Sequence, residues 1–248
     1  MELNIWRAPT DNDMYIKPEW KRAHYDHPVI RAYETTYEKA GGNVQIHSTL
    51  SLSAETVQRM MDVAVTWMVN AAGEVETSIS VLRNPEFPDL PRFGLRMFLP
   101  KSVQKVAYYG LGPNESYPDK RRSSSHGLYV TDVNSLHEDY IRPQENGSHC
   151  DCDYVLVSNH RTQLAITSDT PFSFNASAYT QEELTEKAHN YELVPCDSTV
   201  LCIDYAQNGI GSNSCGPKLR DPYRLKEQRI LFKVKLFPSD IPTDNLNA

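Results

Sequence analysis

Hydrophobic and polar residues alternate with a period of two along much of the chain, which is typical of β-strands with one buried face. The clearest case joins Met61–Val69 to Val75–Val81 across the turn Asn70–Gly73, and it predicts a β-hairpin. We predict further strands over Val44–Leu52, Phe93–Leu99, Val103–Tyr109, Tyr154–Val157, Gln163–Thr167, Phe172–Ala176, Val200–Tyr205 and Ile230–Phe237.

Clusters of Pro, Gly, Asn and Asp separate these predicted strands at short intervals. Such spacing favours an all-β, antiparallel sandwich over alternating β-α-β units. Because each alternating strand can bury only one face, we expect two sheet layers to pack against each other.

Helical signals are few. Thr180 and Glu183 match a capping box that opens a short helix through about His189, and Pro18 suits the first turn of another. By contrast, the segment 110–159 has few alternating apolar positions and is interrupted by prolines. It predicts long loops, which usually belong to a binding rim or a partner interface.

The chain has 248 residues, which fits a single all-β domain spanning residues 1–248. Its formal net charge of −7 excludes the basic surplus expected of a nucleic-acid-binding protein. No apolar run reaches the roughly 20 residues that span a bilayer, and residues 1–9 do not resemble a signal peptide. With an odd count of five cysteines, these features predict a soluble protein of the cytoplasm, without disulfides and without a membrane partner.

The cluster His149-Cys150-Asp151-Cys152-Asp153 contains residue types that can bind a metal. Zinc sites usually pair two C-x₂₋₄-C units, and no second unit is present. On a regular strand, Cys150 and Cys152 would share one face and His149 would lie on the other. We therefore predict a buried or half-buried strand edge here and no metal site.

Several tracts are more particular than ordinary β-protein turns. They are Asn4–Asp13, Pro91–Gly94, Tyr109–Lys120, Arg142–Gly147, Phe172–Ala176 and Gln207–Pro217. In this order they resemble the C-terminal small-chain region of the large, lactase-type bacterial β-galactosidases of glycoside hydrolase family 2. The resemblance covers nearly the whole chain.

The resemblance implies a β-supersandwich related to the galactose mutarotase fold. It also implies a partner, the catalytic (β/α)₈ barrel region or a separate large subunit. In that family the two catalytic glutamates, Mg²⁺ and a monovalent cation are held in the barrel. We therefore expect no catalytic residue, cofactor or metal in this chain, which alone should be inactive. Its expected role is to support the barrel and complete the active-site rim of an enzyme that hydrolyses terminal β-D-galactosides such as lactose.

The family's contribution from this region to sugar binding is a tryptophan in a glycine-rich loop. The matching loop here is Gly209–Gly216, with Cys215 in the place of that tryptophan. We expect Asn213, Ser214 and Cys215 to face the β-galactoside or its aglycone sugar. A thiol offers less area for stacking than an indole. The alternative is that Cys215 is a buried thiol in a tight turn.

Other polar residues have two interpretations. Arg7, Asp11, Asn12 and Asp13 could hydrogen-bond a sugar, but they more simply fix a turn after Pro9. The same holds for three further acidic residues, expected in turns or at a rim: Glu115, Asp119 and Glu145. The three tryptophans, Trp6, Trp20 and Trp67, are expected to anchor the core or an interface.

Two alternative functions come from other classes. An aldose-1-epimerase would need His126 or His189 to converge with Glu145 or Asp204, as acid and base. A carbohydrate-binding module would need exposed aromatic platforms, for which the candidates are Tyr108, Tyr109 and Tyr117. Finally, β-strands of the family domain that precede the Asn4–Asp13 tract have no counterpart here. We therefore expect an exposed sheet edge or groove, a site prone to pairing with another chain.

Overall fold

The computed structural model describes residues 1–55, 58–212 and 214–241, whose strands form one antiparallel sheet. The strands are β1 Glu2–Asn4, β2 Val29–Ala40, β3 Asn43–Ser53, β4 Arg59–Val69, β5 Val75–Arg83, β6 Arg92–Pro100, β7 Lys105–Gly112, β8 Ser125–Asp132, β9 Ser148–Ser158, β10 Thr162–Ser177, β11 Ser198–Gln207 and β12 Arg229–Asp240. The order along the sheet is β1-β6-β11-β10-β12-β5-β4-β3-β2, and β9, β7 and β8 branch from β10. The all-β antiparallel prediction is confirmed.

The sheet curls because β10 is long and changes its neighbour along one edge. Residues 162–168 of β10 pair with β12, whereas residues 173–177 pair with β11. On the other edge β10 pairs with β9, with register shifts between Thr167 and Phe172 and between Phe172 and Phe174. Such irregularities bend a strand and increase its local twist. The predicted strands Gln163–Thr167 and Phe172–Ala176 are therefore one bent strand, and the expected two layers are parts of one continuous sheet.

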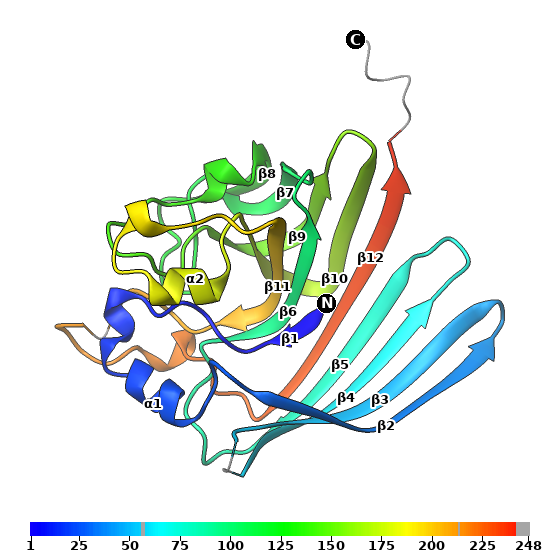
Figure 1. The fold of residues 1–248 in the computed structure, drawn as a ribbon, viewed down its shortest axis with the longest axis horizontal. Helices are drawn as coiled ribbons and strands as arrows, with labels where there is room; N and C mark the ends of the chain where they lie inside the picture. The colour runs from blue at the N-terminus through cyan, green and yellow to red at the C-terminus, as the bar shows by residue number, and fades with distance from the viewer. Residues whose placement is uncertain (56–57, 213, 242–248) are drawn as a thin grey trace.

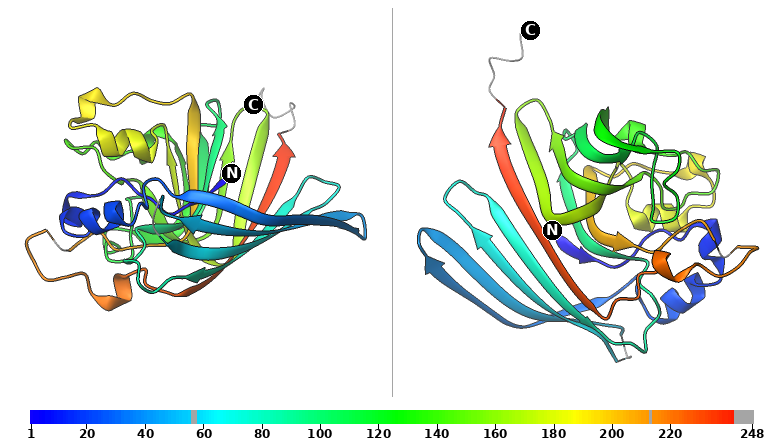
Figure 2. Two further views of the ribbon diagram at one scale, coloured as in Figure 1. Left: turned by 60° about the horizontal axis from the view of Figure 1, so that its bottom comes forward. Right: turned by 180° about the vertical axis from the view of Figure 1, so that it is seen from behind.

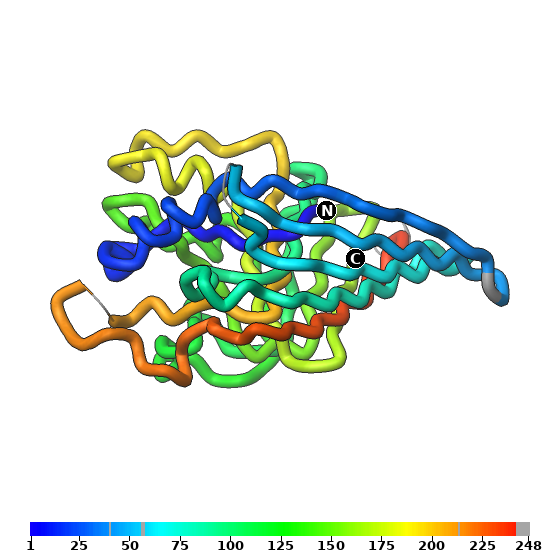
Figure 3. The backbone as a smooth tube through the Cα atoms, turned by 90° about the horizontal axis from the view of Figure 1, so that it is seen from below, coloured from blue at the N-terminus to red at the C-terminus, as the bar shows by residue number. Residues whose placement is uncertain are grey.

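The two ends of the curled sheet differ in character (Figures 1 and 2). The hairpins β2–β3 and β4–β5 reach away from the body as an arm, which Figure 3 shows from below. The opposite side carries the helices and the long loops. The α-helices are α1 Lys17–Arg22 and α2 Gln181–Glu186, and the 3₁₀-helices are η1 Asp11–Met14, η2 Asn134–Leu136, η3 Asn190–Glu192 and η4 Asp221–Tyr223. None of the helices in the described ranges is long and apolar enough to cross a membrane.

Local sequence signals account for both α-helices. Pro18 lies in the first turn of α1, where its missing N–H is not needed. At α2 the Thr180 hydroxyl accepts a hydrogen bond from the Glu183 amide at 3.1 Å, as the predicted cap requires. The Glu183 carboxylate instead accepts from the Val194 amide, and α2 ends at Glu186 rather than near His189.

Three strands escaped the sequence analysis. Every side chain described on β2 is exposed, so its sequence has no buried face to impose alternation. The strand β1 has only three residues, and β8 lies within the segment 110–159 that we expected to be loops. That expectation is wrong for β8, for the start of β9 and for the end of β7. Among the described strands, β2 pairs only with β3 and β1 only with β6, so both are edges of the sheet. The edge expected from missing preceding strands stays a prediction.

The core fills the curl of the sheet and continues under the N-terminal segment. Trp6 and Trp20 are buried and meet edge to face, with ring centroids 6.2 Å apart. Phe174 on β10 and Tyr108 on β7 pack at 5.0 Å. Trp67 is only partly buried, at the outer part of the arm. The predicted core role of the tryptophans is confirmed for Trp6 and Trp20, and the third lies at the margin of the core.

Candidate functional site

The glycine-bearing loop that follows β11 is tied down at its base by main-chain contacts. The Asn208 amide donates to the Pro91 carbonyl at 2.9 Å, and the Gly209 amide donates to the Tyr223 carbonyl at 2.8 Å. The Asn208 side chain accepts from the Leu225 amide at 3.0 Å. The loop therefore leaves the sheet along a fixed path, beside the Pro91–Gly94 tract.

Arg7 holds the same part of the loop from the N-terminal tract. Its guanidinium donates to the carbonyls of Asn208 and Gly209, the latter at 3.1 Å. It also forms an ion pair with Asp13 at 2.8 Å, and both side chains are buried. Asp13 in turn accepts from the Thr10 amide at 2.9 Å. The turn after Pro9 thus positions Arg7, and the turn interpretation of Arg7 and Asp13 is confirmed.

Asp119 and Asn12 form hydrogen bonds with the next two residues of the loop. The Asp119 carboxylate accepts hydrogen bonds from the amides of Ile210 at 2.9 Å and Gly211 at 2.7 Å. The Asn12 side-chain amide donates to the Ile210 carbonyl at 2.6 Å. A Cβ at position 209 would lie 2.7 Å from an Asp119 carboxylate oxygen. Glycine at 209 is therefore what lets the carboxylate approach the loop.

A second polar cluster lies next to these contacts of Asp119 with the loop. The buried Glu115 accepts hydrogen bonds from the Lys120 ammonium and the Tyr140 hydroxyl, and from the Gly147 amide at 2.7 Å. Lys120 and Tyr140 are also 3.2 Å apart. Glu115 and Lys120 come from the Tyr109–Lys120 tract and Gly147 from the Arg142–Gly147 tract. These contacts join two motifs that are separate in sequence.

A cluster of buried charged side chains adjoins a depression in the surface of the protein. The Arg92 guanidinium donates to Asp204 at 2.9 Å and to Glu145 at 3.3 Å, and all three side chains are buried. Burial raises the pKa of Asp204 to about 6, although Arg92 opposes the change. Burial likewise raises the pKa of Glu145, again against the attraction of Arg92. A single guanidinium is thus shared by two carboxyl groups whose pKa values are both raised by burial.

The surface next to this charge cluster has an open depression of about 410 Å³, whose lining includes Glu145. Its lining combines acidic, amide, amine and phenol groups, from Asp11, Asn12, Asp119, Lys120, Tyr140 and Gln144, with the backbone of the loop. Such a mixture of hydrogen-bond donors and acceptors suits a ligand rich in hydroxyl groups. Five of the six tracts singled out from the sequence therefore meet at one place in the fold, whereas Phe174 of the Phe172–Ala176 tract lies in the core.

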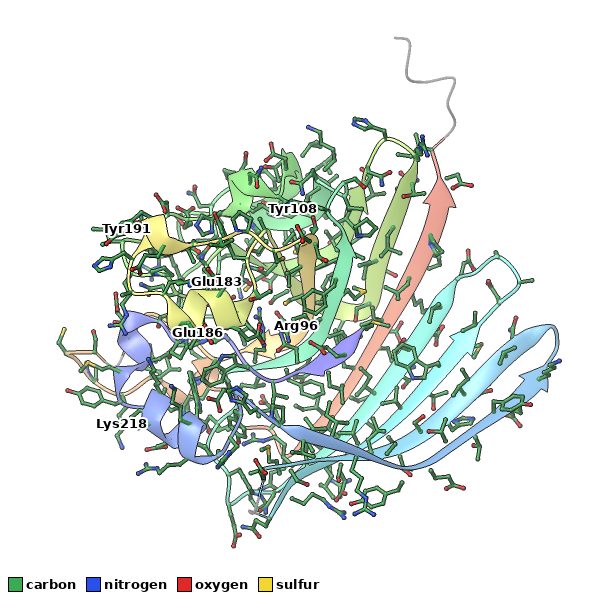
Figure 4. The ribbon with its side chains drawn as sticks, viewed as in Figure 1. Arg96, Tyr108, Glu183, Glu186, Tyr191 and Lys218 are labelled. Atoms are coloured by element: carbon green, nitrogen blue, oxygen red, sulfur yellow. The ribbon has the colours of Figure 1, made fainter. Side chains whose placement is uncertain are left out.

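The three predicted sugar-facing residues lie farther along the loop. Cys215 is exposed and Ser214 is half-buried, with the Ser214 hydroxyl 3.8 Å from the Cys215 sulfur. The alternative of a buried Cys215 thiol is therefore wrong. Asn213 lies outside the described residues. Lys218, farther along, lies beside α1, on the same side of the molecule as Glu183, Glu186 and Tyr191 of the α2 region (Figure 4).

The acid–base pairs that an epimerase would need are not assembled. Glu145 and Asp204 are buried against Arg92, whereas His126 and His189 are exposed. His126 contacts the Asp151 carbonyl at 2.9 Å, and its nearest carboxylate is Asp153 at 3.7 Å. His189 pairs with Glu192. The two histidines therefore have carboxylate neighbours, but different ones from those an epimerase site would use.

The proposed aromatic platforms are also absent from two of their three positions. Tyr108 and Tyr117 are 1% and 0% exposed, and they belong to the interior. Tyr109 is 39% exposed, but it packs edge to face on His126 at 4.8 Å. A flat, open row of aromatic rings is therefore not formed by these tyrosines.

The Cys/His cluster is a bulged strand. Asp151 has a φ of +52°, and this irregularity breaks the alternation, so that His149, Cys150 and Cys152 are all buried. The prediction that His149 would lie on the opposite face from both cysteines rested on a regular strand and does not apply. The His149 Nδ1 atom lies 3.0 Å from the Leu111 carbonyl and 3.1 Å from the Tyr108 hydroxyl. Among the described residues, no group of three metal-ligating side chains is assembled.

Sequence reasoning predicts Asp119 only as a turn or rim residue. Its contact with the loop spans 92 positions, so no local pattern could reveal the partner. The one available signal was that Asp119 and the glycines belong to motifs of the same resemblance. The contact between Asn12 and Ile210 could not be predicted for the same reason, since the two residues are 198 positions apart.

Comparisons with known proteins agree with this convergence of motifs. Residues 1–236 match the protein family described as "Beta galactosidase small chain". The chain is 44% identical to a β-galactosidase of Actinobacillus pleuropneumoniae over 95% of its length, and 41% identical to one of Staphylococcus xylosus over 94%. In both cases it spans 23% of the relative's length.

A likeness in shape to solved structures accompanies these matches. A galactose 1-epimerase from Lactobacillus acidophilus superposes with a TM-score of 0.47 at 8% identity, covering 86% of this chain and 66% of the other. An aldose epimerase homologue from C. elegans gives a TM-score of 0.41 at 10% identity, covering 84% and 69%.

Proposed function

Because this chain belongs to the β-galactosidase small-chain family, we propose that it is the non-catalytic part of a β-galactosidase that hydrolyses terminal β-D-galactosides such as lactose. Its role is to support the catalytic barrel region, or a separate large subunit, and to complete the rim of the active site. The relatives it matches are about four times as long, since the chain spans 23% of each. The remainder of such a polypeptide would supply the chemistry and would hold Mg²⁺ and a monovalent cation.

The carboxyl groups in this chain do not suit catalysis of their own. Retaining glycosidases place two carboxyl groups about 5–5.5 Å apart around an accessible glycosidic bond. Glu145 and Asp204 lie close together, because both contact Arg92, but they are only 4% and 0% exposed. A buried guanidinium between them fixes both groups in the structure. This supports the proposal that the catalytic pair lies elsewhere in the enzyme.

The proposal of a rim role rests on the loop after β11, whose base is held in place by hydrogen bonds. Arg7, Asn12 and Asp119 fix residues 208–211 by hydrogen bonds, and the exposed Cys215 follows on the same loop. A loop with a rigid base and an open tip can present that tip to a substrate bound in a neighbouring barrel. We place Asn213, Ser214 and Cys215 against the aglycone sugar, with the cytoplasm as the compartment.

The rim role can be tested through the thiol itself. This chain replaces its 44% identical counterpart in the A. pleuropneumoniae enzyme, and maleimide labelling of Cys215 is followed by peptide mass spectrometry. We expect isopropyl thiogalactoside or lactose to slow the labelling. An Ala71→Cys variant, at the exposed turn of the β4–β5 hairpin, serves as the control and should label at an unchanged rate. Equal labelling of Cys215 with and without sugar would reject the rim role.

A further inference from the structure

The inner face of the arm is largely apolar. Its side chains become more exposed from β12 toward β2, the strand at the edge of the sheet. Tyr37, Ile46, Trp67, Thr77 and Val234 are successive cross-strand partners on β2, β3, β4, β5 and β12. Directly opposite residues share one face of a sheet. Val234 and Thr77 are 0% exposed, Trp67 and Ile46 are half-buried, and Tyr37 is 74% exposed. The layer that covers β12 and β5 therefore does not reach β3 and β2.

The neighbouring rows show the same gradient. Leu236 on β12 is buried, whereas its row partners Val75, Val69 and Val44 are half-buried. Together, Tyr37, Val44, Ile46, Trp67 and Val69 form a contiguous apolar surface, which we call the open inner face. Tyr37 is exposed and the other four are half-buried. A contiguous apolar surface that is left partly uncovered marks an interaction site.

The opposite face of the same strands has a different composition. Residues 45, 47 and 66, adjacent in sequence to those of the open inner face, are Gln45, His47 and Thr66. His47 and Thr66 are within hydrogen-bonding distance, at 3.1 Å. Beside the open inner face the outer face is thus mainly polar, with Met68 as an exposed apolar residue. The inner face in turn is bordered by the polar residues Thr35, Lys39 and Ser48.

The edge of the sheet adds a second feature of a docking surface. The twelve residues of β2 pair with β3, and no other described strand lies beside them. A free edge presents main-chain donors and acceptors that another strand can use. An apolar face and an open edge at one place suit a β-structured partner.

We propose that the open inner face and the β2 edge dock the remaining part of the β-galactosidase polypeptide. This inference rests on the proposed function and names the surface through which it works. The length of chain that the relatives have beyond this segment, about three quarters of each, supplies the occupant. The net charge of −7 on each copy opposes the alternative of a second copy of this chain on the same face.

The test measures binding between this chain and the A. pleuropneumoniae β-galactosidase expressed without its matching segment. Trp67→Glu and Ile46→Glu place a charge on the open inner face. Met68→Glu and Gln45→Glu place the same charge at adjacent positions on the outer face and serve as matched controls. We expect the two inner-face variants to weaken binding by at least about tenfold, because a charge replaces an apolar side chain at the contact. The controls should stay within about threefold.

Thermal melting of each variant shows whether it folds. Should an inner-face variant not fold, hydrogen exchange on the unaltered chain provides the second measurement. We expect the amides of β2 and β3 to become protected when the partner is added. Binding without such protection, or inner-face variants that bind as well as the controls, would overturn this inference and leave the proposed function standing. No binding by the unaltered chain would overturn both proposals.

Discussion

The carboxylate of Asp119 accepts a hydrogen bond from the Gly211 amide at 2.7 Å, across 92 positions of sequence. The same carboxylate accepts from the adjacent Ile210 amide. One side chain from the loop after β7 thus sets the course of the loop after β11. The geometry links the long segment 110–159 directly to the loop that we place at the active-site rim.

Removing this carboxylate should loosen the loop more than it destabilises the fold. In Asp119→Ala the amides of Ile210 and Gly211 lose their acceptor. We expect the free energy of unfolding to fall by about 1–3 kcal/mol. Hydrogen exchange at these two amides should accelerate by at least about tenfold. Asp132→Ala, which removes the acceptor of the Ser135 amide, is a control of the same chemistry outside the loop. Unchanged exchange at 210 and 211 would contradict the role of Asp119.

The close approach of Asp119 predicts different tolerance at two glycines of one loop. A Cβ at Gly209 would lie 2.7 Å from Asp119 and 2.9 Å from Leu219, whereas at Gly216 it would meet nothing within 4 Å. We expect Gly209→Ala to lower the free energy of unfolding by about 1–3 kcal/mol. Gly216→Ala should change it by less than about 0.5 kcal/mol. Chemical denaturation of both variants measures the difference, and equal values would show that the loop is not held as described.

The buried charge cluster predicts a specific pH dependence. The pKa of Asp204 is raised to about 6 in the folded state, above the unfolded value of about 3.9. Between these values the folded state binds more protons than the unfolded state, so this group's contribution to stability falls as the pH rises from about 4 to about 6. The contribution is complete below pH 4 and is lost above the folded pKa.

Asp204→Asn should remove that part of the dependence. The free energy of unfolding is measured by denaturation at pH 4.5 and pH 6.5, and the change between them is compared with the unaltered chain. An Asp153→Asn variant, at an exposed position of β9, should leave the change as it is. The same pH dependence in Asp204→Asn and the unaltered chain would place the raised pKa elsewhere.

Much of the sheet could be predicted because its strands have one buried face. Met61–Val69 and Val75–Val81 alternate clearly, and both lie within the observed strands β4 and β5. The strand β2 could not be found in this way, since its exposed side chains carry no alternation. The single long β10 was divided in the prediction because residues 168–171 lack apolar alternation while the strand bends through them.

The candidate site was predictable in part, through the motifs rather than through local pattern. The resemblance singled out Arg7, Asn12 and Asp119 within two tracts, but not their common contact with the loop. Such contacts depend on the tertiary arrangement of segments about 90–200 positions apart. The bulge at Asp151, which brings His149 to the buried side, was likewise invisible to a period-two analysis.

A tryptophan in place of Cys215 should improve binding of the second sugar. A stacked aromatic ring contributes roughly 0.5–1.5 kcal/mol beyond its area burial in aromatic pairs, which corresponds to about two- to tenfold in affinity. In the enzyme assembled with this chain, Cys215→Trp should therefore raise the apparent affinity for glucose as acceptor in transglycosylation. Hydrolysis of a nitrophenyl galactoside should stay within a few-fold. Unchanged acceptor affinity in a folded variant would place the loop outside the second-sugar site.

The most direct test of the central claim is the rate of nitrophenyl galactoside hydrolysis by this chain and its partner, separately and together. The partner is the A. pleuropneumoniae β-galactosidase expressed without the segment that this chain matches. We predict no turnover by this chain alone, little by the partner alone, and a large gain on mixing. Turnover by the purified chain alone would contradict its non-catalytic role. A mixture no faster than the partner by itself would contradict its role in supporting the enzyme.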